Sequence, residues 1–141
     1  MNKKGLSLVE LFLTLSVLSL LIGIGSNGFN SLIEMSKAYS IVKTVRNSFV
    51  KGMYKSYDLN VPIKVRLKDN KITFYKSSKN KWKEIESLKL KNYCNTFMNI
   101  SPVFFPNGYV SPTCSVYIIS DNYKYKITIS FYGRIKVIRI S

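Results

Sequence analysis

Residues 11–33 read LFLTLSVLSLLIGIGSNGFNSLI, an apolar run without a charged side chain. A helix rises about 1.5 Å per residue, so this run is long enough to cross a hydrocarbon core about 30 Å thick. Lys3 and Lys4 precede it, and basic residues favour the cytoplasmic side of a membrane. We therefore expect a single-pass membrane segment with a cytoplasmic N-terminus, and the chain beyond residue 33 outside the cytoplasm.

One carboxylate, Glu10, stands at the head of this run, and the next charged residue is Glu34. An unpaired charge beside so much apolar surface is costly in free energy. The sequence therefore raises the question of what compensates the charge of Glu10.

The helical pattern continues beyond the apolar run, so we expect one helix over 6–56 with an apolar part (6–33) and an amphipathic part (34–56). In the amphipathic part, lysine and arginine fall mostly outside a stripe of apolar residues at helical spacing. We interpret this stripe as a packing face; it comprises Met35, Tyr39, Val42, Phe49 and Met53.

After residue 57 the hydrophobic period changes to two. Val61, Ile63, Val65 and Leu67 alternate with lysine and arginine, and Asp69 then begins a turn. Further strands are expected over 71–76, 82–90, 117–120, 125–131 and 135–140, with 91–101 left as an uncertain connection. The predicted fold is α+β: a long N-terminal hydrophobic helix, transmembrane before assembly, packed on an antiparallel β-meander or small β-sandwich formed by 57–141.

Composition argues against ordinary enzyme chemistry. The chain has no histidine, and its two cysteines, Cys94 and Cys114, cannot complete a four-ligand zinc site alone. We expect no catalytic, cofactor or metal site. Outside the cytoplasm the two cysteines could form a disulfide, and the alternative is two buried reduced thiols.

The chain is strongly basic, with 22 Lys and Arg against 7 Asp and Glu and a formal net charge of +15. Such a surface attracts polyanions or anionic surfaces. Lysine-rich composition can equally follow from an AT-rich genome, so both interpretations stay open.

The start of the chain resembles the type III signal of type IV pilins and pseudopilins. Two lysines, Gly5, the residues LSLV, Glu10 and a long apolar run occur in the family's order, although Leu6 stands where the family more often has Phe or Met. The resemblance implies that a prepilin peptidase cuts between Gly5 and Leu6, removes the leader 1–5 and leaves the helix on the mature protein, with N-methylation of Leu6.

The same resemblance implies a role for Glu10. In the family's helical filaments, this glutamate pairs with the new α-amine of a neighbouring subunit, here that of Leu6. The implied partners are prepilin peptidase, membrane lipid before assembly, an inner-membrane assembly platform and other pilin or pseudopilin subunits. The implied location is the cell membrane and then a pilus or pseudopilus on the extracytoplasmic side.

Residues 103–137, VFFPNGYVSPTCSVYIISDNYKYKITISFYGRIKV, resemble the C-terminal β-domain of H-type minor pseudopilins and of minor pilins in competence pili. Together the two resemblances imply a minor pilin or pseudopilin, a structural subunit of a type IV pilus, a competence pilus or a type II secretion pseudopilus.

An alternative function is contact with DNA in natural transformation. Cations of the β-domain could bind phosphates, and nearby Tyr123, Tyr125 and Tyr132 could stack on bases. The competing interpretation is a solvated basic face. The candidate cations are Lys124, Lys126, Arg134, Lys136 and Arg139, with Lys64, Arg66 and Lys68 on another strand.

Overall fold

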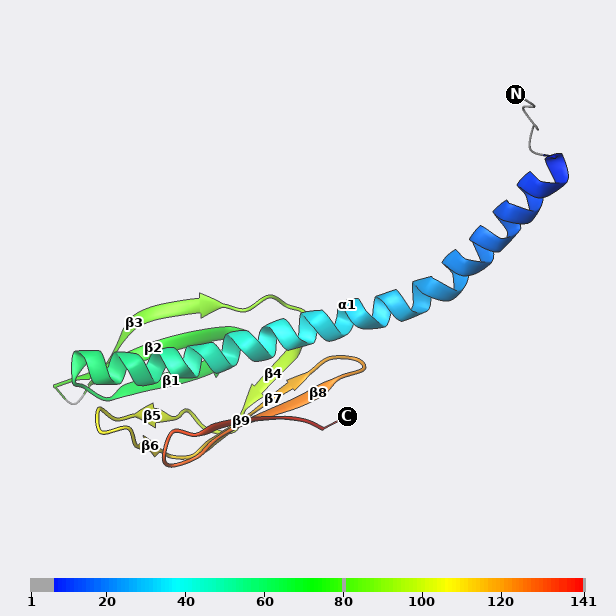
Figure 1. Cartoon of the computed structure of the whole chain (residues 1–141). Helices are drawn as coiled ribbons and strands as arrows, with labels where there is room; N and C mark the ends of the chain where they lie inside the picture. The colour runs from blue at the N-terminus through cyan, green and yellow to red at the C-terminus, as the bar shows by residue number, and fades with distance from the viewer. Residues whose placement is uncertain (1–6, 80, 141) are drawn as a thin grey trace, which may run out of the picture. The chain divides into compact units, whose positions relative to one another are not determined.

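The computed structural model describes residues 7–79 and 81–140, with the backbone alone for 24–27. Within these residues the chain forms one helix, α1 (Leu8–Leu59), followed by nine strands (Figure 1). It divides into two compact units, one ending at Glu34 and the other beginning at Met35.

The first unit is the apolar part of α1, and its large apolar side chains are exposed, from Leu8 onward. Its most apolar 18-residue window has a mean hydropathy of 2.2, and none of that window is buried. Among the described residues, α1 is the one helix long and apolar enough to cross a membrane. Its apolar surface is therefore available to lipid or to other chains.

In the second unit, α1 buries a stripe that differs from the predicted one. Val42 and Phe49 are buried as expected, but Met35 and Tyr39 are 38% and 57% exposed, so their assignment to the packing face was wrong. Ile41, which the predicted stripe omitted, lies in the core. The buried stripe is Ala38, Ile41, Val42, Val45 and Phe49.

The helix also extends to Leu59, three residues beyond the predicted end at 56. Ser56 is buried, and its hydroxyl donates to the carbonyl oxygens of Met53 at 2.7 Å and Phe105 at 3.4 Å. The helix ends before Asn60, whose φ of 52° is the left-handed conformation common after a helix C-terminus.

The strands form two antiparallel sheets. The five-stranded sheet has the order β3-β2-β1-β5-β6 and the four-stranded sheet the order β4-β7-β8-β9. The previously unassigned residues 91–101 contain β4. The strand bounds are β1 Ile63–Lys68, β2 Lys71–Ser78, β3 Lys81–Lys89, β4 Asn95–Met98, β5 Val103–Phe104, β6 Val110–Ser111, β7 Cys114–Ile119, β8 Lys124–Ile129 and β9 Ile135–Arg139.

The predicted first hairpin is confirmed. Asp69 and Asn70 both have positive φ, 50° and 54°, as a two-residue type I′ turn requires. The turn sets the register in which Lys68 lies opposite Lys71 and Val65 opposite Phe74. The apolar residues of β1 consequently all face the core.

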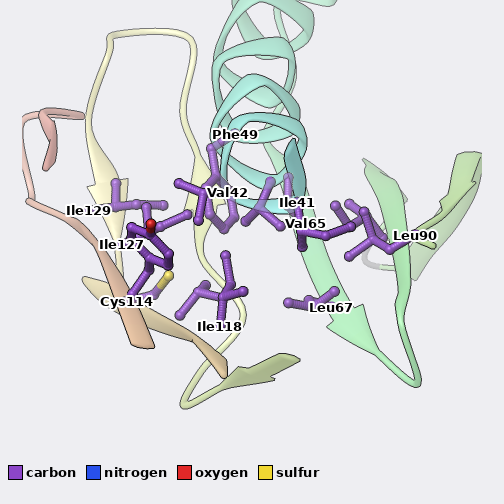
Figure 2. Packing of buried hydrophobic residues seen from close by; sticks show 14 of the residues in the cluster. Ile41, Val42, Phe49, Val65, Leu67, Leu90, Cys114, Ile118, Ile127 and Ile129 are labelled. Atoms are coloured by element: carbon purple, nitrogen blue, oxygen red, sulfur yellow. The ribbon is translucent and has the colours of Figure 1, made fainter. Parts of the chain in front are cut away.

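Side chains from α1 and from both sheets meet in one core (Figure 2). Val42 and Phe49 of the helix lie above Val65 of the first sheet and Ile118 and Ile127 of the second. This arrangement confirms the α+β expectation, with two sheets in place of a simple meander.

The helix approaches the strands closely at Gly52. A Cβ added there would lie 2.8 Å from Val65 Cγ2 and 3.1 Å from Phe104 Cδ2. Real Cβ atoms essentially never come as close as 2.8 Å to another heavy atom, and 3.1 Å is tighter than most of their contacts. Val65 and Phe104 are both buried, so neither can move freely. Gly52 therefore fixes how deeply the helix sits on the five-stranded sheet.

We expect Gly52→Val to lower the free energy of unfolding of the β-domain by about 1 to 3 kcal/mol, because overpacking forces Val65 or Phe104 to move. Denaturant unfolding of the full chain in detergent, followed by Trp82 fluorescence, measures this change. Asn47→Val is the matched control, since Asn47 is exposed on the same helix; its expected effect is within about 0.5 kcal/mol. Equal effects of the two substitutions would contradict the packing argument.

Candidate functional site

The first candidate site is the start of α1. Gly5 and Leu6, the expected cleavage residues, lie outside the described residues. Ser7 precedes the helix, and its backbone N–H donates to Glu10 Oε2 at 3.2 Å. In return, Ser7 Oγ accepts from the backbone N–H of Val9 at 3.3 Å. Ser7 and Glu10 thus form a reciprocal helix cap of the S-x-x-E type.

This cap gives Glu10 a local role that the sequence reasoning missed, although the Ser7-x-x-Glu10 spacing was readable. A carboxylate in the first turn is also stabilised by the positive end of the helix dipole. The carboxylate remains exposed, and the cap uses only one of its acceptor sites, so the carboxylate can still bind a cation. Glu10 can therefore hold the helix start and still pair with an external amine.

Apolar surface surrounds Glu10 on the same helix. Val9 and Leu11 are 71% and 51% exposed, and Phe12 is likewise exposed. Lipid would supply no hydrogen bonds to a carboxylate on such a surface. With lipid around this surface, a charged partner for Glu10 has to come from another polypeptide or from the chain terminus.

The predicted phosphate contacts fall into separate groups. On the face of the four-stranded sheet that points away from the core, Lys126 lies opposite Ile138, and Lys136 lies opposite Thr128. Lys124 shares this face. The side chains of β8 on the other face, including Ile127, are buried. Lys124, Lys126 and Lys136 therefore form one surface, which we call the outer face.

Two aromatic side chains, which sequence reasoning missed, lie on the outer face. Phe97 of β4 is opposite Tyr117 of β7, with ring centroids 6.5 Å apart. Lys126 Nζ lies 5.5 Å from the centroid of the Tyr117 ring. The alternation of β7 could have placed Tyr117 outward, but the position of Phe97 depended on the unassigned strand β4.

The remaining predicted contacts do not join this group. Arg139 lies opposite Tyr125 on the core-side face, and its guanidinium is 4.9 Å from the Tyr123 ring. Tyr123 and Tyr125 are buried, so their predicted stacking on bases was wrong. Arg134 lies in the turn before β9, next to the exposed Tyr132.

A second basic surface lies on the first sheet. Three lysines lie directly opposite one another on adjacent strands: Lys68 on β1, Lys71 on β2 and Lys89 on β3. Repulsion between these like charges destabilises the pairing of the strands. Lys71 Nζ is 3.7 Å from Glu84 Oε1, which offsets part of this repulsion. We call Lys68, Lys71 and Lys89 the lysine ladder.

On the other side of β3, Glu86 binds the helix. It pairs with Lys51 and, at 3.1 Å, with Lys55 Nζ. The hydrogen bond from Lys51, followed by that from Lys55, lowers the pKa of the Glu86 carboxyl below its usual value. This cluster links α1 to the edge strand β3 and serves the fold rather than a reaction.

The two cysteines are free, buried thiols and lie at opposite ends of β7. Asn95 is opposite Ile119, so Cys94 lies beside Ser120, while Cys114 begins β7. At about 3.3 Å per residue the two positions are roughly 20 Å apart, whereas disulfide-bonded Cα atoms lie within about 7 Å. Of the two alternatives that the sequence left open, the register therefore favours reduced thiols.

A groove of about 530 Å³ lies between the end of α1 and the segments around Phe105 and Ile135. Val50, Met53 and Tyr109 are among its lining residues, so it is mainly apolar. Within 7–79 and 81–140, no three His, Cys, Asp or Glu side chains lie close enough together to hold a metal ion.

No protein-family model and no curated protein matches this sequence. Two solved structures of the minor pseudopilin EpsH from the type II secretion system of Vibrio cholerae resemble the chain, with TM-scores of 0.59 and 0.57. Their sequence identities are 13% and 12%; each covers 73% of this chain, and the matches cover 97% and 94% of the EpsH chains. The chain therefore has the fold of a minor pseudopilin.

We expect both cysteines to be reduced and slow to react with iodoacetamide in the folded, full-length protein at pH 8. The thiolate is the reactive form, and burial raises the pKa of Cys114 to about 12 and also raises the pKa of Cys94. Intact mass under non-reducing conditions, with and without denaturant, measures this. A mass lacking both thiol hydrogens, or fast alkylation before unfolding, would contradict the structure.

Proposed function

We propose that this chain is a minor pilin or pseudopilin, a structural subunit of a helical filament rather than an enzyme. The observation that supports this most directly is the apolar part of α1, none of whose most apolar window is buried. The fold likeness to a minor pseudopilin points in the same direction. The proposed filament is a type IV pilus, a competence pilus or a type II secretion pseudopilus.

In this proposal a prepilin peptidase cuts the precursor between Gly5 and Leu6, and Leu6 is then N-methylated. The precursor sits in the membrane with its N-terminus in the cytoplasm, and the β-domain lies on the extracytoplasmic side. An inner-membrane assembly platform moves the mature subunit from lipid into the filament.

Transfer of the helix from lipid to a filament involves little hydrophobic driving force, because lipid tails are as apolar as leucine side chains. Side-chain packing and polar pairs between helices must then determine the position of each subunit in the filament. Cleavage creates an α-amine at Leu6, close to Glu10 in sequence. Pairing of this amine with Glu10 of a neighbour compensates two charges that are costly alone in an apolar environment.

Contact with DNA is the second candidate function, and it is the outer face that favours it. Lys124, Lys126 and Lys136 lie there together with the rings of Phe97 and Tyr117. Cations that bind phosphates beside aromatic rings that stack on bases are the combination used for single-stranded nucleic acids. Arg134 would contribute from the neighbouring turn, whereas Arg139 lies on the opposite face over the Tyr123 ring and is not part of this surface.

For the filament role we expect Glu10→Ala and Glu10→Gln to leave cleavage intact. Both should reduce incorporation into filaments about tenfold or more, because removal of the carboxylate leaves a buried amine without its charged partner. The measurement is the ratio of mature subunit in sheared filaments to that in membranes, in cells that express the assembly machinery.

Glu10→Gln separates the two roles of this side chain. Glutamine can still accept the hydrogen bond from Ser7 N–H and complete the helix cap, but it carries no charge. Wild-type incorporation of Glu10→Gln, together with loss in Glu10→Ala, would show that the cap alone explains Glu10 and would contradict charge pairing.

For the DNA role we expect replacement of Lys124, Lys126 and Lys136 by glutamine to weaken binding of the full chain to single-stranded DNA. The slope of log affinity against log salt should decrease in magnitude by about 2. Fluorescence anisotropy of a labelled oligonucleotide over a range of salt concentrations measures both quantities.

The matched control removes the same charge from another surface, by replacing the three residues of the lysine ladder with glutamine. An unchanged slope in this control supports a site on the outer face. Equal losses in both triple variants would instead indicate non-specific attraction to a basic protein and would sink the DNA proposal.

A further inference from the structure

Strand β9 forms a free edge of the four-stranded sheet, since its only neighbour among the described residues is β8. Antiparallel strands alternate between pairs that exchange hydrogen bonds and pairs that do not. The N–H of Ile140 donates to Lys124 O at 2.8 Å, and that of Ser130 donates to Arg134 O at 3.0 Å. Even-numbered residues of β9 therefore bond to β8.

The odd-numbered residues consequently point their backbone N–H and C=O groups away from the sheet. These residues are Ile135, Val137 and Arg139, each of which forms a non-bonded pair with β8. Such a row of unpaired groups is a template for an additional strand. Outward groups on three alternate residues match a partner segment of about five residues.

The side chains of β9 are also incompletely covered. Val137, on the core-side face, is 37% exposed, and Ile138, on the outer face, is 41% exposed. A strand laid beside β9 would cover both faces at once. At the start of the strand, Ile135 also lines the groove of about 530 Å³ beside α1, so an apolar side chain of the added strand has a cavity to enter.

The other edges are less suited to strand addition. β3 carries three lysines and two glutamates among its nine residues, and its pairing with β2 is interrupted after Phe74. β4 has four residues, and β6 has two. Short, charged and irregular edges are how proteins prevent such pairing. β9 has five residues, three of them apolar, and pairs with β8 without a register shift.

We propose that β9 binds an extended segment of a partner protein as an added antiparallel strand. Lys136 and Arg139 set the chemistry of that segment: apolar residues interrupted by aspartate or glutamate opposite the two cations. A second copy of this chain is disfavoured, because it brings the same two cations and a net charge of +15 to the interface. This inference stands independently of filament assembly.

The test uses the full chain in detergent micelles and a labelled peptide, acetyl-Thr-Glu-Val-Ile-Glu-Val-Thr-amide, whose glutamates fall opposite Arg139 and Lys136 in an antiparallel register. The control peptide has lysine at both glutamate positions. We expect binding of the acidic peptide alone, measured by fluorescence anisotropy. Amide hydrogen exchange should slow at Val137 and Arg139 when the peptide is bound.

Val137→Pro removes an outward N–H without removing a hydrogen bond to β8. We expect it to weaken peptide binding about tenfold, whereas Val137→Thr, which keeps the donor, should bind as wild type. Slow alkylation of Cys114 verifies that each variant is folded. As an independent arm, the double variant Lys136→Glu and Arg139→Glu should exchange the preference and bind the lysine peptide.

Equal affinity of Val137→Pro and wild type would overturn the proposal, as would unchanged hydrogen exchange at Val137 and Arg139 with peptide bound. Failure of the wild-type chain to bind the acidic peptide better than the lysine peptide would also overturn it. A concentration-dependent dimer that Val137→Pro abolishes would assign the edge to a second copy and reject the acidic partner.

Discussion

The apolar surface at the start of α1 is the constraint on which the rest of the structure depends. None of the most apolar window of the helix is buried. In the proposed role, lipid covers it before assembly and other helices cover it in the filament. A chain that keeps such a helix after maturation is suited to storage in a membrane and to packing in a filament.

In the second unit, part of the apolar surface of α1 is buried. From Met35 onward, α1 buries one stripe in a core shared by two sheets, and Gly52 brings the helix close to Val65. Lys51 and Lys55 bind Glu86 on the far strand of the first sheet. The apolar surface of this one continuous helix is thus exposed in the first unit and largely buried in the second.

Local chemistry made much of this predictable. The long apolar run, the period of two in β1 and the turn at Asp69 each involve residues close in sequence, and the structure contains all three features. Non-local pairing was harder to predict. Strand β4 becomes regular through pairing with β7, and only this register shows that Cys94 and Cys114 are too far apart for a disulfide.

The candidate site was predictable to the same extent. The position of Glu10 was evident, but its hydrogen bond with Ser7 was missed. Tyr39 and Tyr123 show the limits of periodicity. The helical spacing of Tyr39 could not reveal which neighbouring stripe meets the sheets, and for Tyr123 residue type alone did not indicate burial under Arg139.

The mature N-terminus is the most direct measurement of the central claim, that the apolar helix stays on the mature subunit. N-terminal sequencing and intact mass of the wild-type protein, isolated from cells with an active prepilin peptidase, determine it. We predict a chain that begins at Leu6 and has lost only MNKKG. A chain that still begins at Met1, or one cut after the apolar run, would contradict this account.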